Sequence, residues 1–226
     1  MGHPLDRPIW NALNGLQADL AEVSGGIRRY APAYAPFAAT ADGTAESLVH
    51  LALLVPPGGR IVLQQDELVA PPPNLVLVRV ALTVQMVAER MEKPREDFSF
   101  DALTEADAGD MRALAELTQP GPFAERTHEL GRFVGIRRAG KLIAMAGERM
   151  KLESFTEISG VCTHPDYRGK GYAEQLMREI GQGIFARGGI PFLHAFADNK
   201  SAIALYERLG FVTRWQPKLI VMENYS

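Results

Sequence analysis

Two glycines and two basic residues form the turn Arg168-Gly169-Lys170-Gly171, which lies between a predicted strand and a predicted helix. Glycine lets a backbone approach a ligand closely and adopt conformations that other residues avoid. The first turn of a helix has unpaired N–H groups and carries the positive end of the helix dipole. Together with Arg168 and Lys170, these groups form a site suited to a phosphate or a pyrophosphate.

The elements on either side of this turn have clear local signals. Residues 156–163 can run extended, which predicts one face with Glu157, Ser159, Val161 and Thr163 and the other with Ile158, Gly160 and Cys162. Pro165 ends this strand, because it lacks an N–H and disfavours helix at His164. A helix follows, whose apolar stripe is Ala173, Leu176, Met177, Ile180 and Ile184.

Two blocks of residues carry a family resemblance. The pattern Arg168-x-x-Gly171-x-Ala173 after a strand resembles the acyl-CoA loop of the GNAT superfamily of N-acyltransferases. The block Asn199-x-x-Ala202-Ile203-x-Leu205-Tyr206-Glu207-x-Leu209-Gly210-Phe211 resembles a later helix of the same family. The resemblance covers roughly residues 98–222. It implies an α/β fold with a mixed, mostly antiparallel twisted sheet and flanking helices, and direct transfer of acetyl from acetyl-CoA to a primary amine.

The same resemblance implies a set of ligand-binding residues. It places the pyrophosphate of acyl-CoA at Arg168, Gly169, Lys170, Gly171, Tyr172 and Ala173. It places the pantetheine arm along Val161, Cys162 and Thr163, through the backbone groups of Val161 and Thr163. Asn199 would hold the pantetheine or the backbone near it, and its alternative role is a plain helix cap.

Acyl transfer to an amine requires a proton for the departing thiolate. Tyr206 matches the family tyrosine that donates this proton, and a phenol with a pKa of about 10 is protonated at neutral pH. The alternative is a core tyrosine, because Tyr206 shares an apolar stripe with Leu205 and Leu209.

The acceptor amine is mostly protonated at pH 7, so the reaction also requires a base or a water relay. Glu157 is the predicted base, because it lies in the strand that would carry the thioester, where burial would raise its pKa. A carboxylate that only faces solvent is the alternative for Glu157, and Glu148 on the neighbouring strand is the second choice of base. A nucleophile and base formed by Cys162 and His164 is disfavoured, because residues two apart in a strand and its turn need not meet.

The composition is that of an ordinary globular protein. The 226 residues are 46% hydrophobic and 23% charged, and the formal charge of −3 lacks the basic excess of a nucleic-acid binder. Cys162 is the only cysteine, which excludes an intramolecular disulfide and a cysteine cluster for zinc. The sequence shows neither a secretion signal nor a membrane span. We expect a cytoplasmic monomer or homodimer that needs no metal and binds neither nucleic acid nor membrane.

The charged segment 91–97, which contains Pro94, predicts a division into residues 1–95 and 96–226. The first part is expected to be a smaller α/β region, either a degenerate GNAT-like copy or a lid or dimerisation segment. Its predicted elements are a helix over 9–20, a strand over 37–40, a helix beginning after Thr44 and strands over 60–68 and 76–86. The second part is predicted to contain a short strand over 98–100, a hairpin of 132–138 and 141–149, a strand over 192–197, a helix over 200–209 and a closing strand region over 211–222.

Three classes of function can be compared at this point. An N-acyltransferase accounts for both blocks, and a non-catalytic acyl-CoA-binding module is the alternative. A P-loop protein is excluded, because the spacing Gly-x-x-x-x-Gly-Lys followed by Ser or Thr is absent. The acceptor stays open among amino acids, polyamines, antibiotics, peptide amino termini and protein lysines.

Overall fold

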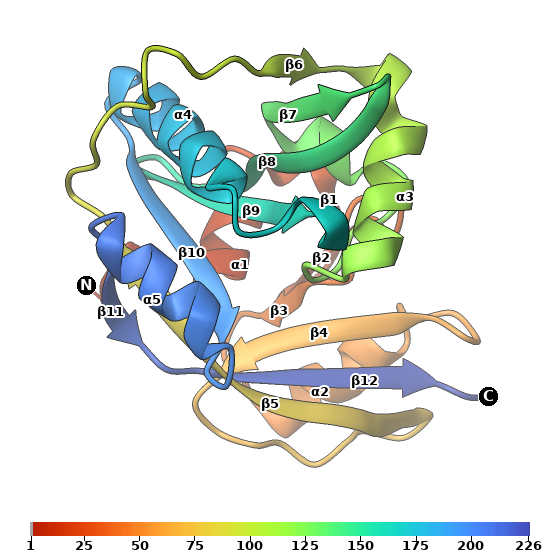
Figure 1. Cartoon of the computed structure of the whole chain (residues 1–226). Helices are drawn as coiled ribbons and strands as arrows, with labels where there is room; N and C mark the ends of the chain where they lie inside the picture. The colour runs from red at the N-terminus through yellow and green to blue at the C-terminus, as the bar shows by residue number, and fades with distance from the viewer. Residues whose placement is uncertain (1) are drawn as a thin grey trace.

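The computed structural model describes residues 2–226, which form one nine-stranded sheet, one three-stranded sheet and the helices around them (Figure 1). The strands are β1 Ala21–Ser24, β2 Ile27–Tyr30, β3 Ala38–Thr40, β4 Arg60–Gln65, β5 Leu75–Val87, β6 Asp101–Leu103, β7 Phe133–Arg138, β8 Lys141–Lys151, β9 Phe155–Thr163, β10 Ile190–Phe196, β11 Val212–Trp215 and β12 Lys218–Asn224. The α-helices are α1 Pro8–Leu13, α2 Ala45–Ala52, α3 Ala108–Thr118, α4 Tyr172–Ala186 and α5 Lys200–Arg208. Within residues 2–226, no helix has both the length and the apolar character needed to cross a membrane.

The large sheet has the order β4-β12-β5-β10-β9-β8-β7-β6, and β11 pairs with β5 beside this path. Strands β9 and β10 are parallel, and α4 makes the crossover between them. The other strand pairs of the large sheet are antiparallel. The predicted mixed, mostly antiparallel α/β fold is therefore confirmed.

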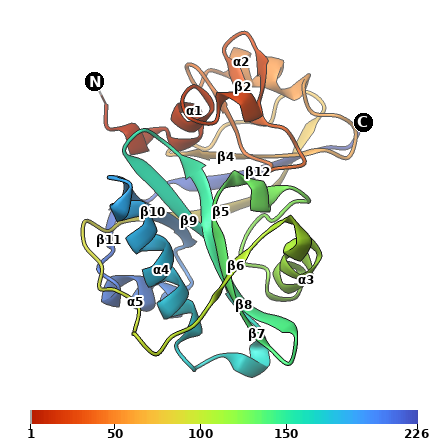
Figure 2. The same ribbon diagram turned by 90° about the horizontal axis from the view of Figure 1, so that it is seen from above.

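The helices lie on both faces of the central strands. Figure 2 shows α4 and α5 on one side of β8 and β9, and α3 on the other. The predicted stripe of α4 packs on the sheet, because Leu176, Met177 and Ile180 are fully buried in one cluster with Val134 and Ile158. This packing fixes the helix start, and with it the glycine turn, against the end of β9.

Strand β5 joins two parts of the sheet. Residues 75–82 pair with β12, and residues 83–87 pair with β10 and with β11. Strand β12 lies between β4 and β5, so the last strand of the chain separates two strands that belong to the first 95 residues.

The helix predicted after Thr44 is α2, and the Thr44 hydroxyl accepts a hydrogen bond from the Ser47 N–H at 3.2 Å. The predicted hairpin is β7 and β8, which turn at Ala139 and Gly140, both with positive φ.

Two predicted elements were misplaced. The helix predicted over 9–20 ends at Leu13, because the chain turns at Gly15 and Leu16 is 60% exposed, so the apolar face does not continue. The strand predicted over 98–100 is β6 at 101–103. The backbone of β6 pairs with β7, whereas the rings of Phe98 and Phe100 pack against the cluster beneath α4.

Candidate functional site

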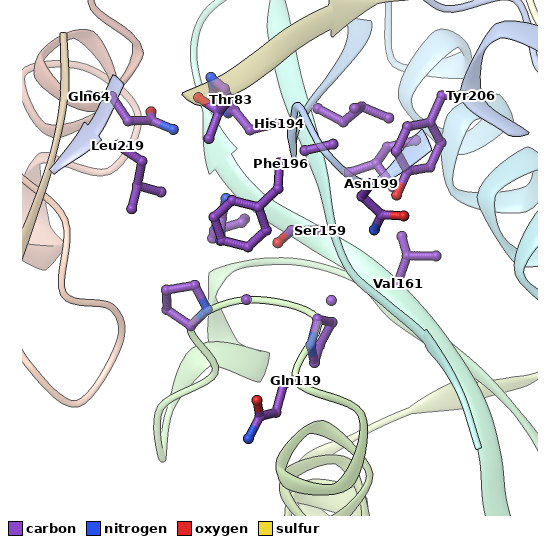
Figure 3. A pocket seen from close by; sticks show the side chains of 18 of the residues that line it. Gln64, Thr83, Gln119, Ser159, Val161, His194, Phe196, Asn199, Tyr206 and Leu219 are labelled. Atoms are coloured by element: carbon purple, nitrogen blue, oxygen red, sulfur yellow. The ribbon is translucent and has the colours of Figure 1, made fainter. Parts of the chain in front are cut away.

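The main pocket lies where β9 and β10 separate. The two strands pair only along Phe155, Thr156 and Glu157, although both continue beyond this point. The pocket extends through the resulting gap, from Val161 and Tyr206 at one end to Gln64 and Leu219 at the other (Figure 3). The pairing therefore leaves the edge of β9 open beyond Glu157 on the side of β10.

A bulge in β9 contributes to this separation. Gly160 has a φ of +63°, and the pairing of β8 with β9 shifts by one residue between Ser159 and Cys162. The predicted alternation of faces is therefore wrong beyond Ser159: Val161 packs with Ile158 beneath α4, whereas Cys162 is buried in the cluster of α3. A bulge bends its strand and increases the local twist.

Beyond the bulge, β9 presents backbone groups to its open side. The His164 N–H donates to the Ile143 carbonyl of β8 at 2.8 Å, so the preceding residue, Thr163, directs its backbone away from β8. The Thr163 carbonyl accepts a hydrogen bond from Nε of Arg168 at 3.2 Å. This contact ties the end of the strand to the basic turn that follows.

The glycine turn has the geometry of an anion site. Gly169 and Gly171 have φ of +76° and +77°, and a Cβ built on either would have no heavy atom within 4 Å. Gly171 is the N-cap of α4 and provides no side-chain cap, so the N–H groups of the first helical turn point out unpaired by a side chain. Arg168 and Lys170 are exposed beside them, and Ala173 lies in the first turn of α4.

One basic residue near this turn was missed by sequence reasoning. The Arg138 guanidinium lies 5.8 Å from the ring centroid of Tyr172, the first residue of α4. Arg138 ends β7, 30 positions before the turn begins at Arg168, and only the packing of the β7–β8 hairpin brings it there. The Lys170 ammonium lies 5.2 Å from the ring of Tyr167.

Helix α5 brings Tyr206 and Asn199 to the same end of the pocket (Figure 3). The Tyr206 ring packs edge-on against Phe211, with centroids 6.2 Å apart, and burial raises the pKa of its hydroxyl to about 12. Among residues 2–226 the hydroxyl has no hydrogen-bond partner. Oδ1 of Asn199 caps α5 by accepting the Ala202 N–H at 3.2 Å, while its Nδ2 is left without a partner in the described part of the chain. The cap predicted for Asn199 is present, and the free amide group still faces the pocket.

Glu157 is fully buried in an ion pair. Its carboxylate accepts hydrogen bonds from Nε and Nη2 of Arg149, at 2.8 and 2.7 Å, and from Nδ1 of His194, at 2.8 Å. Burial alone would raise the pKa of Glu157, but the Arg149 charge and the hydrogen bonds from His194 and Arg149 outweigh burial and lower the pKa to about 2. The predicted raised pKa is therefore wrong, because the sequence did not reveal the partner of this carboxylate.

The other candidates lie outside the pocket. Glu148 pairs with Arg187 at 2.5 Å and with Lys151 at 3.4 Å, and it does not line the pocket. Burial raises the pKa of the Cys162 thiol to about 11, so the thiol is protonated at neutral pH. Nδ1 of His164 accepts the Asp166 N–H at 3.3 Å, within its own turn.

A second cluster of polar groups lies away from the pocket. Ligand atoms of Glu105, His128 and Glu129 lie within 4.8 Å of one another. Arg126 already pairs with Glu129 through two contacts of 2.6 Å, which balances one of the two carboxylates. The cluster is accounted for as surface ion pairs.

The comparisons with known proteins agree with this geometry. A family profile described as FR47-like protein matches residues 133–220. The N-alpha-acetyltransferase RimI of Mycobacterium tuberculosis is 36% identical over 135 residues, which cover 54% of this chain and 82% of that protein. The crystal structure of a GNAT-family protein from Novosphingobium aromaticivorans is 45% identical, with a TM-score of 0.93 and 100% of both chains covered.

A more distant structure supports the fold alone. The GCN5-related N-acetyltransferase from Kribbella flavida is 17% identical, with a TM-score of 0.59 over 96% of this chain and 93% of that one. This chain belongs to the GNAT family of acetyltransferases.

Proposed function

We propose that this chain transfers an acetyl group from acetyl-CoA to the nitrogen of a primary amine. The observation that carries this proposal is the gap between β9 and β10, where one pocket joins the end of α5 with Tyr206 to the opposite face of the sheet. A gap of this kind lets a thioester and an amine approach each other from opposite faces.

The turn before α4 fits acyl-CoA. Its two glycines have positive φ and open space where a side chain would lie, and the uncapped helix start with Arg168 and Lys170 suits a pyrophosphate. We assign the pyrophosphate to residues 168–173 and the pantetheine arm to the open edge of Val161, Cys162 and Thr163, with Nδ2 of Asn199 beside it. We further assign acyl-CoA binding and catalysis to residues 96–226, and part of the wall of the acceptor site to residues 1–95, which contribute Phe37, Gln64 and Thr83.

The roles of the side chains follow from their positions. Acetyl-CoA supplies a thioester, whose C–S bond breaks with its electron pair on sulfur as the amine nitrogen bonds to the acetyl carbon. Tyr206 donates a proton to that sulfur, and its pKa of about 12 keeps it protonated at any working pH. The nitrogen loses one proton. We assign this proton to Nε2 of His194, which lines the pocket and lies 3.2 Å from Nε2 of Gln85. Glu157 holds Nδ1 of the same ring, and with a pKa of about 2 it positions His194 and does not take the proton itself.

The function is tested by a thiol-release assay with acetyl-CoA against a panel of amines. The name of the M. tuberculosis relative, an N-alpha-acetyltransferase, places α-amines first in that panel. Release of CoA that depends on one amine, with the acetylated amine identified by mass spectrometry, is the expected result. Tight acetyl-CoA binding without turnover of any amine would instead identify a non-catalytic binding module.

We expect one acyl-CoA site per chain. Only residues 168–171 combine paired positive-φ glycines, two basic side chains and an uncapped helix start of 15 residues in the described chain. Calorimetric titration with CoA should give a stoichiometry near one per chain. Two equivalent sites would contradict the assignment of CoA binding to residues 96–226.

We expect Gly171→Val to weaken acetyl-CoA binding by about 10- to 100-fold, because a β-branched residue at a φ of +77° costs about 1–3 kcal/mol and its side chain enters the anion site. Lys170→Ala should weaken binding by less than about 5-fold, because an exposed charge is screened. Gly188→Val is the matched control, since Gly188 also has a φ of +77° and open space, but at the far end of α4. Calorimetry on the three variants should show the largest loss of affinity for Gly171→Val and no loss for Gly188→Val. A larger loss for Lys170→Ala than for Gly171→Val would contradict the model of a backbone cradle.

A further inference from the structure

The acceptor end of the pocket has an unusual balance of charge. Among the lining residues described within 2–226, the basic side chains are Arg149 and His194, and both pair with Glu157 behind them. No carboxylate lines the pocket in this part of the chain. If the acceptor carried a second ammonium group, that group would lie near the Arg149 guanidinium, and no carboxylate of the pocket would balance its charge.

Arg149 still has a donor to offer. Its Nε and Nη2 bind Glu157, and the guanidinium stacks over the Phe37 ring at 4.6 Å. The side chain is only 7% exposed, and in residues 2–226 its Nη1 makes no hydrogen bond. A buried, fixed guanidinium with a free Nη1 group is suited to a carbonyl or carboxylate oxygen.

Gln64 offers the complementary group. Its Oε1 is fully buried and has no hydrogen-bond partner among the described residues. An unpaired buried acceptor costs about 1–3 kcal/mol, so an N–H donor placed there restores that free energy. Figure 3 shows Gln64 and Leu219 at the end of the pocket opposite Tyr206 and Asn199. An acceptor that binds Gln64 therefore has a part that extends away from Tyr206 and from its own reacting nitrogen.

Apolar side chains line much of this pocket, beside the polar residues Thr83, Gln119 and Ser159. Phe37, Pro120, Pro122, Phe196 and Leu219 line it. Rings and aliphatic side chains of this kind favour an apolar group on the acceptor through burial of its surface.

Resting on the proposed function, we propose that the acceptor is the α-amino group of an apolar amino acid whose carboxyl group is an amide, as in an amino-acid amide or the amino end of a peptide. The amide carbonyl accepts Nη1 of Arg149, and the amide N–H donates to Oε1 of Gln64. The apolar side chain lies between Phe37 and Phe196. A simple arylalkylamine has neither the carbonyl that binds Arg149 nor the N–H that binds Gln64. A free amino acid lacks the amide N–H. A polyamine adds a positive charge that no carboxylate of the pocket balances.

The experiment compares acceptors that differ by one group each. Phenylalaninamide and the amide of Phe-Ala-Ala are compared with phenylalanine, 2-phenylethylamine and spermidine at saturating acetyl-CoA. The value compared is kcat/KM calculated on the concentration of unprotonated amine, because α-amines have a lower pKa than alkylamines and are less protonated at the same pH. We expect both amides to exceed 2-phenylethylamine by about 10- to 100-fold, since each hydrogen bond to a buried group contributes about 1–3 kcal/mol. The ratio of kcat/KM for the tripeptide amide to kcat/KM for phenylalaninamide then shows whether the preferred acceptor is the amino end of a peptide or a free amino-acid amide.

A pair of variants tests the role of Gln64. Gln64→Leu should lower the ratio of kcat/KM for phenylalaninamide to kcat/KM for 2-phenylethylamine by about 10-fold, because only the amide reaches Oε1. Gln65→Leu is the matched control on the same strand, since Nε2 of Gln65 donates to the Glu67 carbonyl and Gln65 does not line this pocket. Thermal midpoints of both variants confirm that they are folded.

The outcomes separate this proposal from the one on which it rests. Equal kcat/KM for phenylalaninamide and 2-phenylethylamine, a preference for spermidine, or an equal effect of Gln64→Leu on both acceptors would overturn the acceptor class while acetyl transfer stands. Absence of turnover with every amine would overturn the proposed function itself.

Discussion

Replacing Tyr206 with Phe will lower kcat by about 10-fold to 10³-fold, while the thermal midpoint and the affinity for acetyl-CoA change little. The ring is retained, so its edge-on packing with Phe211 persists. The hydroxyl has no partner among residues 2–226, so its removal leaves no buried group unpaired. The loss in kcat cannot exceed the contribution of a general acid. It is made smaller by solvent, which can protonate the thiolate without Tyr206.

Tyr30→Phe provides the matched control. Tyr30 is also buried, but its hydroxyl donates to Oε1 of Gln17 at 2.6 Å. That variant should lose about 1 kcal/mol or more of stability with kcat per folded molecule unaltered. Thermal midpoint, CoA affinity and kcat measured on both variants distinguish the two roles. An unchanged kcat for Tyr206→Phe, once chemistry is shown to limit the rate, would remove Tyr206 from the mechanism.

The second large effect is expected from Glu157→Gln, which should destabilise the chain by about 3–5 kcal/mol at pH 7, because Arg149 is left buried without its countercharge. The pKa of Glu157 is lowered from 4.5 to about 2, so its ionised form contributes stability that is fully present above pH 4.5. This contribution is lost as the pH falls from about 4.5 towards 2. The difference between parent and variant should therefore shrink on acidification, by on the order of 1 kcal/mol per pH unit.

Urea unfolding of both proteins at pH 7, 5, 4 and 3.5 measures this difference. Glu153→Gln serves as a control, because Glu153 is exposed at the turn before β9. It should change the free energy of unfolding little at any of these pH values. A parent-to-variant difference that is constant down to pH 3.5 would contradict the lowered pKa of Glu157.

The geometry of the turn that we propose for the pyrophosphate could be predicted from sequence because all its signals are local. The stop at Pro165, the glycines at 169 and 171 and the stripe of α4 lie within about 20 positions, and each has a backbone reason that holds in any context. The same is true of the hairpin turn at Ala139 and Gly140 and the cap at Thr44.

The acceptor end could not be predicted in this way. Phe37, Gln64 and Thr83 come from separate segments of the first 95 residues, and only long-range strand pairing brings them to one pocket. The pKa of Glu157 was misjudged for a related reason. Two irregularities in the pairing of β8 with β9 decide that Arg149 meets Glu157, and no residue type announces such a shift of register.

The position of β12 between β4 and β5 bears on how this protein matures. A ribosome releases β4 and β5 long before it has made Lys218–Asn224, and in the finished sheet all of β4 and residues 75–82 of β5 pair with β12. Ile220 and Met222 of that strand are fully buried in the cluster beneath α2, so this cluster is incomplete until they arrive. The amino-terminal part of the nascent chain therefore has unpaired strand edges until β12 is made. Such edges are bound by chaperones and promote aggregation. The sheet closes only after translation of its final strand.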